Sequence, residues 1–171
     1  MKKTVSVLIT TMCLMATATM NLKAQINTSK TKTKKMETVK ESKEVVQGFF
    51  NAFGKGDFNG IMNAFDDSAT LIAVRDANRN ESQIYGKYKG KEGAKAFISN
   101  LGKTFDTKAF SVDNIIGEGN IVFANGKFTH SVKSSGKSFS SDWVLMCVIK
   151  DEKILEYHFY EDSEKFVEAN K

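Results

Sequence analysis

Two side chains in the C-terminal half of the sequence, His130 and Asp142, have the types and the spacing of an acid–base pair. An imidazole and a carboxyl group can exchange protons near neutral pH, because burial raises the pKa of an Asp and a neighbouring imidazolium lowers it. The turn signal Ser134-Ser135-Gly136 places them on the two strands of one predicted hairpin. An odd loop centred on Gly136 pairs His130 with Asp142. A two-residue loop pairs it with position 141 and separates the two side chains.

The next hairpin, built around a two-residue turn at Asp151-Glu152, decides which side chains share a face with Asp142. In that register 148 lies opposite 155, 146 opposite 157 and 144 opposite 159. We expect the concave, helix-covered face to be Asp142, Val144, Met146, Val148, Leu155, Tyr157 and Phe159. The opposite face would hold Trp143, Leu145, Cys147, Ile149, Ile154, Glu156, His158 and Tyr160, and its large apolar groups predict a dimer interface.

Two interpretations of the His130–Asp142 pair remain open. In the catalytic one, Asp142 is a base at the end of an apolar stripe, His130 is its partner, and Tyr88 or Tyr157 supplies a hydroxyl donor. In the structural one, Asp142 caps a turn or bonds Ser140, and His130 is a core histidine. No metal site is expected, because the two histidines of the sequence fall on opposite predicted faces.

The elements that position these residues change from helices to strands along the chain. A capping box at Thr38–Glu41 and an apolar stripe behind it predict a first helix that ends near Gly54. Further helices are expected over 57–65 and 94–105, strands over 69–74, 108–116, 120–132, 137–150 and 153–160, a loop over 75–90, and a short final helix over 163–169. Helices followed by an antiparallel meander predict an α+β fold, with the helices on one face of a curved sheet.

The N-terminal part has a different composition. Lys2 and Lys3 precede an apolar, Thr-rich stretch that ends near Ala24, and this layout predicts a secretory signal peptide over 1–24, the alternative being a retained membrane anchor. Residues 25–40 are rich in Lys and poor in apolar side chains, which predicts a basic, disordered tether. The protein is then secreted or periplasmic, with no stable membrane insertion after cleavage.

The predicted domain, residues 41–169, is close to neutral and holds one cysteine. Although the whole chain carries a formal charge of +5, residues 41–171 contain 17 basic and 19 acidic residues. No nucleic-acid partner is therefore expected. Cys147 is the single cysteine beyond the predicted signal peptide, so it cannot form an intramolecular disulfide and is expected to be a buried thiol.

Five segments of the chain match signatures of one protein family. They are Phe50–Asp57 (FNAFGKGD), Tyr85–Gly93 (YGKYKGKEG), Ser135-Gly136-Lys137, Asp151-Glu152-Lys153-Ile154 and Tyr160-Glu161-Asp162. In this order they resemble the SnoaL-like branch of the nuclear transport factor two-like superfamily, which includes ketosteroid isomerases and small polyketide cyclases. The resemblance spans about 41–168. Glu152 stands where the family usually has Gly, which indicates a different turn.

This resemblance implies a cone, in which a curved antiparallel sheet wraps on about three helices around a central pocket, often in homodimers. SnoaL-like cyclases carry a His and an Asp across the corresponding hairpin, and these roles map onto His130 and Asp142. The side chains expected to contact a ligand are Phe53, Tyr88, Val144, Met146, Tyr157 and Phe159. We expect an exported domain that binds a small hydrophobic molecule, with cofactor-free isomerase, cyclase or hydrolase chemistry. The alternative is a non-catalytic ligand-binding or dimeric adaptor module.

Overall fold

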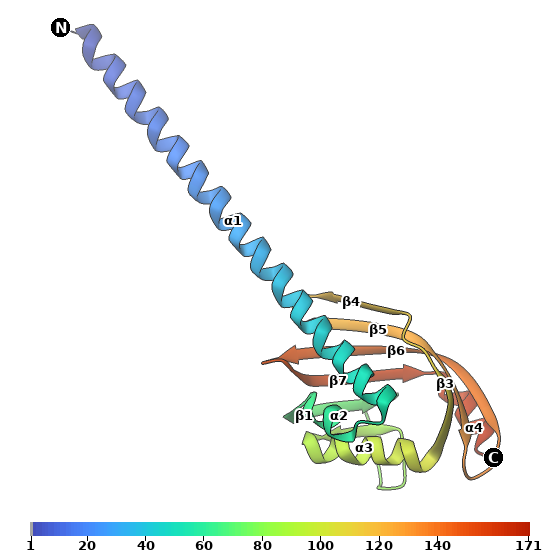
Figure 1. Ribbon diagram of the computed structural model, residues 1–171. Coiled ribbons are helices and arrows are strands. Elements are labelled where there is room, and N and C mark those ends of the chain that lie inside the picture. Colours follow the sequence, from blue (N-terminus) through green and yellow to red (C-terminus); the bar gives the residue numbers. More distant parts are fainter. Residues whose placement is uncertain (1) are drawn as a thin grey trace. The chain divides into compact units, whose positions relative to one another are not determined.

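The computed structural model describes the backbone of residues 2–171 and the side chains of residues 28–171 (Figure 1). Its elements are α1 (Lys2–Lys55), α2 (Phe58–Asn63), β1 (Phe65–Ala73), β2 (Gly86–Lys89), α3 (Gly90–Thr104), β3 (Phe105–Phe110), β4 (Asn114–Glu118), β5 (Ile121–Val132), β6 (Ser138–Lys150), β7 (Lys153–Glu161) and α4 (Ser163–Ala169). The chain divides into two compact units, the first ending at Thr38 and the second comprising Val39–Lys171.

Residues 25–40, expected from the sequence to be a disordered tether, belong to helix α1 (Lys2–Lys55). Helix α1 begins at Lys2, and the side chains of residues 28–37 are exposed. The hydroxyl of Thr38 donates to the carbonyl oxygen of Lys34 at 3.0 Å, an i to i−4 bond of the helix interior. Thr38 is therefore not an N-cap, and the predicted helix start is wrong. No helix among the described residues is both long and apolar enough to cross a membrane.

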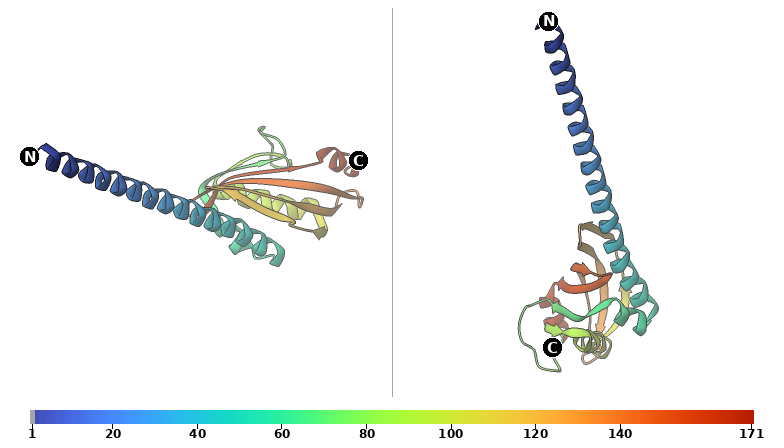
Figure 2. Two further views of the ribbon diagram at one scale, coloured as in Figure 1. Left: turned by 90° about the horizontal axis from the view of Figure 1, so that it is seen from above. Right: turned by 90° about the vertical axis from the view of Figure 1, so that its left-hand side faces the viewer.

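The second unit is the α+β fold predicted from the sequence, built on a seven-stranded curved sheet. The strand order is β2-β1-β7-β6-β5-β3, and β4 pairs with β5 beyond that path. The sheet is mixed rather than wholly antiparallel, because β1 runs parallel to β7. Figure 2 shows α2, α3 and the last turns of α1 together on one side of this sheet.

Strict alternation of burial along the long strands identifies the inner face. Along β5 the side chains of Val122, Ala124, Phe128, His130 and Val132 are buried, whereas their neighbours in the strand are more exposed. Helix α1 packs three phenylalanines of its apolar stripe, Phe49, Phe50 and Phe53, against this core. Burial of apolar side chains contributes about 25 cal/mol per Å², so this layer stabilises the unit.

A one-residue bulge in β7 reverses the predicted faces of β6. Lys150 pairs with Lys153 and Ile149 with Ile154, as the two-residue turn predicts, but Val148 then pairs with Glu156 and leaves Leu155 without a partner. The extra residue moves β6 by one position relative to the outer part of β7. The inner face of β6 is therefore Trp143, Leu145, Cys147 and Ile149, each less than 9% exposed. The prediction was wrong for β6.

The predicted faces of β7 are partly right. Tyr157 and Phe159 lie on the inner face as expected, and the ring of Phe159 stacks on that of Trp143 with centroids 5.6 Å apart. Because the predicted register put these two rings on opposite faces, this contact is direct evidence of the bulge. Tyr160 lies on the outer face as expected, 45% exposed. Its partner across the two strands, Val144, was expected on the inner face but also lies on the outer one, 46% exposed.

Candidate functional site

The predicted His130–Asp142 pair does not form. The β5–β6 hairpin closes around residues 133–136, and the Val132 amide donates to the Lys137 carbonyl at 2.8 Å. In this register His130 pairs with Phe139 and Asp142 pairs with Lys127, so both predicted loop lengths were wrong. The Asp142 side chain is 82% exposed on the outer face and forms an ion pair with Lys127 at 3.2 Å. His130 is buried on the inner face, so the two groups cannot exchange a proton directly.

His130 instead lines a narrow cavity on the inner face, between the sheet and the helices. The lining is mostly aromatic and aliphatic: Phe49, Phe50, Phe53, Phe97, Ile98, Leu101, Phe110, His130, Tyr157, Phe159 and Glu161. Helices α1 and α3 supply the first six residues, and strands supply the other five. The cavity volume is about 40 Å³, which is room for no more than a few water molecules. In such an apolar enclosure the few polar groups are candidates for binding and for proton transfer.

Glu161, the last residue of β7, is the carboxyl group in this cavity. Desolvation by burial raises the pKa of Glu161 to about 7, although a hydrogen bond from Tyr85 opposes that rise. The donor is the Tyr85 hydroxyl, which reaches the Glu161 Oε1 atom from the segment before β2. Tyr85 itself has a strongly raised pKa, because its hydroxyl is desolvated and faces the carboxylate. Glu161 is therefore a group that gains and loses a proton near neutral pH.

The surroundings of His130 keep its imidazole neutral. Its ring stacks on Phe128 at 4.1 Å and on Phe105 at 4.9 Å between centroids, with interplanar angles of 19° and 11°. Burial among these rings lowers the pKa of His130 to about 4. Its Nδ1 atom has no hydrogen-bond partner among the described residues, and neither has the Nε1 atom of Trp143. Buried polar atoms without partners are uncommon, and the one on His130 belongs to a cavity-lining residue.

The predicted ligand-contacting residues divide into three groups. Phe53, Tyr157 and Phe159 line the cavity. Tyr88 is buried beside Phe97, and its hydroxyl donates to the Ile84 carbonyl at 2.8 Å. Val144 and Met146 lie on the outer face of β6, opposite Tyr160 and His158 of β7. Their placement follows from the bulge at Leu155 and is a correction to the predicted site.

Glu161 was missed as a site residue, although the sequence carries a signal for it. The inward alternation Tyr157, Phe159 continues by two residues to Glu161, which pairs with Trp143 on the same inner face. Extending the β7 pattern by one step would have placed a carboxyl group at the end of an apolar stripe. The donor Tyr85 has no such signal, because its bond to Glu161 spans 76 residues of sequence.

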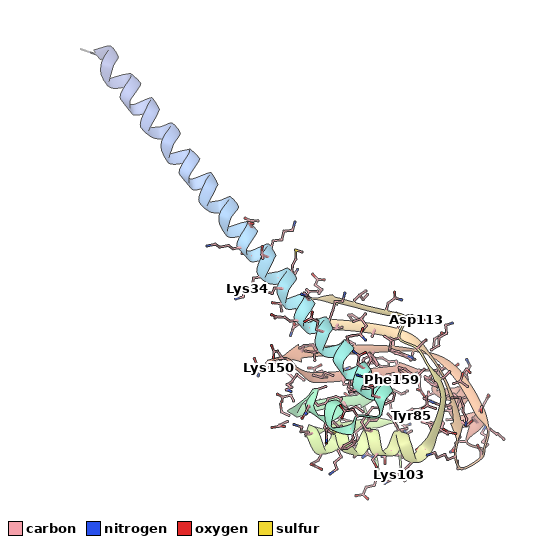
Figure 3. All side chains as sticks on the ribbon, viewed as in Figure 1. Lys34, Tyr85, Lys103, Asp113, Lys150 and Phe159 are labelled. Atoms are coloured by element: carbon pink, nitrogen blue, oxygen red, sulfur yellow. The ribbon has the colours of Figure 1, made fainter. Side chains whose placement is uncertain are left out.

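The segment that carries Tyr85 is a loop, residues 74–85, with side-chain hydrogen bonds inside it. Arg79 stacks its guanidinium 3.8 Å from the centroid of the Tyr88 ring and donates to the carbonyl oxygens of Asn80 and Gln83. Figure 3 shows the labelled Tyr85 and Phe159 within the domain. Fixed in this way, the loop holds the Tyr85 hydroxyl at the Glu161 carboxyl. Within the described residues, no three His, Cys, Asp or Glu side chains gather in the manner of a metal site.

Comparison with known proteins places this geometry in a family. The model of the SnoaL-like domain matches residues 46–157, about two thirds of the chain. The chain belongs to the SnoaL-like family. The match covers Phe49, His130 and Tyr157 and ends four residues before Glu161, so the carboxyl group lies just outside the matched range. No curated protein matches the sequence.

Solved structures with the same fold include an NTF2-like protein from Burkholderia xenovorans, with a TM-score of 0.68, 21% identity, and coverage of 78% of this chain and 98% of that one. A candidate SnoaL-like polyketide cyclase from Mesorhizobium loti has a TM-score of 0.57, 20% identity and coverage of 68% and 96%. TerC, co-crystallised with polyporic acid, has a TM-score of 0.65, 18% identity and coverage of 76% and 98%. At these identities the likeness shows the SnoaL-like, nuclear transport factor two-like fold of this chain.

Proposed function

We propose that the SnoaL-like domain binds a small apolar molecule with one polar group in the inner cavity, and that Glu161 exchanges a proton with that group. The observation that carries the proposal is the Glu161 carboxyl itself, which lies in an aromatic enclosure, is held by Tyr85 and has a pKa of about 7. A group with this pKa acts equally well as acid and as base near neutral pH. The base is therefore Glu161, in place of the predicted Asp142.

The other polar atoms of the enclosure suit the same ligand. Neutral His130 offers a ring nitrogen that no described residue bonds, and a ligand hydroxyl or carbonyl would satisfy it. Tyr157 lines the same cavity, and burial keeps its pKa well above the usual value, so its phenol stays protonated as a donor. A solved neighbour with the same fold, TerC, was crystallised with an organic acid, polyporic acid, which supports small-molecule binding in this fold.

The size of the cavity sets a requirement on binding. A volume of about 40 Å³ does not hold an aromatic ring, so a ligand must displace lining side chains. Phe53, Ile98, Leu101 and Phe159 line it and are only partly buried, which makes them the side chains with room to move. We propose that they open together as the ligand enters.

Phenol and toluene test the proposal, because they match in size and differ in one hydroxyl. We expect both to shift the NMR signals of Tyr157 and Phe159, and phenol to bind about 10-fold more tightly at pH 8 than at pH 6, because a charged acceptor strengthens its hydrogen bond. Toluene should bind equally at both pH values, and Glu161→Gln should remove the pH dependence of phenol binding. Equal, pH-independent binding of the two compounds would contradict the proposal. Conversion of a substrate library, followed by mass spectrometry, separates enzyme from binding module.

We also propose that the domain forms a homodimer through the outer face of the sheet. The predicted interface was the face with Trp143 and Leu145, but those side chains are buried in the core. The outer face instead exposes Phe123 and Val144, at 44% and 46%, in a patch that favours association. Val144→Lys should shift a dimer to a monomer in sedimentation equilibrium, whereas Ser140→Lys, on the same strand and face, should not. A wild-type monomer would contradict the proposal.

Export is the third part of the proposal. The basic start, the apolar stretch and Ala24 support cleavage of a signal peptide and a secreted or periplasmic location. Mass spectrometry of protein expressed in its native host should find a mature N-terminus at Gln25 outside the cytoplasm. An intact Met1 in the cytosolic fraction would overturn this part.

A further inference from the structure

A second concave site, distinct from the inner cavity, is lined by Tyr85. It is an open groove of about 450 Å³ between loop 74–85, the end of α3, the β5–β6 turn and α4. Its walls combine apolar side chains, such as Phe166 and Val167, with the cations Arg75 and Lys103. Figure 3 shows Lys103 at the end of α3. Nothing in the proposed function of the cavity uses this groove.

All charged residues that line the groove are basic. Among the described residues that line it, none is acidic, and the neutral polar ones include Gln83 and Thr104. Neither Arg75 nor Lys103 forms an ion pair with a described residue. In contrast, several lysines elsewhere on the surface are paired, for example Lys87 with Asp76 and Lys165 with Asp162. Two unpaired cations in a concave site without carboxylates favour an anion.

The apolar part of the groove is also unusual for a surface. Val167 of α4 is 52% exposed, and the Phe166 ring packs edge-on against Tyr85 with centroids 5.3 Å apart. This apolar wall lies beside the two cations, so the groove is amphipathic. Its chemistry matches a molecule with an anionic head and a short apolar body.

The backbone at Arg75 supports a functional role for this site. Val74 has a φ of 66°, which is rare for a β-branched residue, and the Arg75 amide donates to the Ala73 carbonyl at 2.8 Å across it. This strained turn directs the chain out of β1 and places Arg75 in the groove. Arg75 lies close enough to Tyr85 to oppose the rise in the pKa of the phenol. Strain of this kind is concentrated at functional sites.

We propose that this groove binds a small amphipathic carboxylate, with its anionic head on Arg75 and Lys103 and its apolar body on Phe166 and Val167. The guanidinium of Arg75 offers the two parallel donors that fit a carboxylate. Tyr85 connects this groove to the cavity, since it lines the groove and its hydroxyl bonds the cavity residue Glu161. An occupant of the groove therefore contacts the residue that hydrogen-bonds Glu161 of the cavity.

Octanoate, 1-octanol and acetate test this proposal on the folded protein. We expect octanoate to bind and to shift the amide NMR signals of Gln83, Thr104 and Val167. Acetate lacks the apolar body and 1-octanol lacks the charge, so each should bind the groove at least 10-fold more weakly. The double variant R75Q/K103Q should weaken octanoate binding at least 10-fold. The control K91Q/K108Q removes the same charge from lysines paired with Asp67 and Asp106, and should change it less than twofold.

Three other results would overturn the groove proposal. A fourth would overturn it and leave the cavity proposal intact. Equal weakening by both double variants would indicate a general effect of net charge. Absence of octanoate binding at millimolar concentration, or groove binding of 1-octanol as tight as that of octanoate, would remove the basis for the site. If octanoate shifts Tyr157 and Phe159 instead of the groove amides, the groove fails as a site while the cavity remains a ligand site.

Discussion

The Tyr85 hydroxyl donates a hydrogen bond to the Glu161 carboxyl and so joins loop 74–85 to the last residue of β7. Two opposing effects meet at this bond. Burial disfavours the charged carboxylate, and the donated hydrogen bond favours it. The balance leaves the pKa of Glu161 at about 7, within the range where both protonation states are populated in most compartments.

Glu161→Gln should change how stability depends on pH. The pKa of Glu161 is about 7 in the folded protein and about 4.5 when unfolded, so between these values the folded state keeps a proton that the unfolded state has lost. Raising the pH through this window therefore removes the contribution of Glu161 to the free energy of unfolding, which is at most about 3 kcal/mol. Urea denaturation should show that E161Q gains stability relative to wild type between pH 5 and pH 8. The exposed control E164Q should show no such gain, and an equal effect at both pH values would contradict the prediction.

His130→Phe should reveal the opposite dependence. Because burial lowers the pKa of His130 to about 4, against 6.5 when unfolded, its contribution to stability is present above pH 6.5 and is lost as the pH falls to about 4. The phenylalanine removes this loss and also the unpartnered Nδ1 atom, so H130F should be more stable than wild type at pH 5 by about 1–3 kcal/mol. His158→Phe, on the outer face, is the control. A less stable H130F at pH 5 would contradict the prediction.

The two titrations partly cancel in the wild type. Between about pH 4.5 and 6.5 the Glu161 contribution falls with rising pH while the His130 contribution rises. The free energy of unfolding of the wild type is therefore expected to change little with pH in this window. Each single variant removes one titration and so reveals the pH dependence that the other one causes.

Tyr85→Phe should raise the pKa of Glu161 further. The variant removes the donor that favours the charged carboxylate and leaves the burial of the site almost unchanged. The titration of the 13C carboxyl signal of Glu161 measures this directly, without any ligand. Tyr88→Phe is the matched control, since it removes a hydroxyl that bonds the Ile84 carbonyl near the same loop. A pKa unchanged in Y85F, or raised equally in Y88F, would show that the bond does not tune Glu161.

The β6–β7 hairpin shows which features of the fold could be predicted from the sequence and which could not. Asp151 and Glu152 form the predicted two-residue turn, and both have positive φ, of 48° and 58°, as the common hairpin turn requires. The bulge at Leu155 was not predictable, because both faces of β6 and β7 are rich in apolar residues. Alternation then fits either register, and a slip of one residue exchanges the faces.

The candidate site shows a second limit. Its inward residues on one strand, Tyr157, Phe159 and Glu161, follow a local period of two and were open to prediction. The polar contact that defines the site was not, because Tyr85 comes from a loop without periodicity and from a distant part of the chain. His130 lies buried on the inner face, but it does not pair with Asp142, because the four-residue loop of the hairpin matches neither of the two predicted loop lengths.

Gly126→Ala should destabilise the domain through the aromatic core. Gly126 pairs with Trp143, and a Cβ atom there would lie 2.0 Å from the Ser111 carbonyl oxygen and 2.8 Å from a Trp143 ring carbon. A backbone carbonyl cannot move cheaply, so we expect a loss of about 2 kcal/mol or more in urea denaturation. Gly102→Ala, in α3 with no atom within 4 Å, should instead gain up to about 1 kcal/mol. Equal effects of the two substitutions would contradict the packing of Trp143 over Gly126.

Asp142→Asn is the sharpest comparison with Glu161→Gln, because both replace a carboxyl by an amide and only one of the two groups lines the cavity. Asp142 is exposed, and its ion pair with Lys127 contributes at most about 1 kcal/mol. D142N should therefore leave the affinity for phenol and its pH dependence unchanged, whereas E161Q should abolish the pH dependence. If D142N alone removed it, proton exchange would belong to the outer face of the sheet. The cavity would then be packing space, and the assignment of Glu161 as the acid–base group would be wrong.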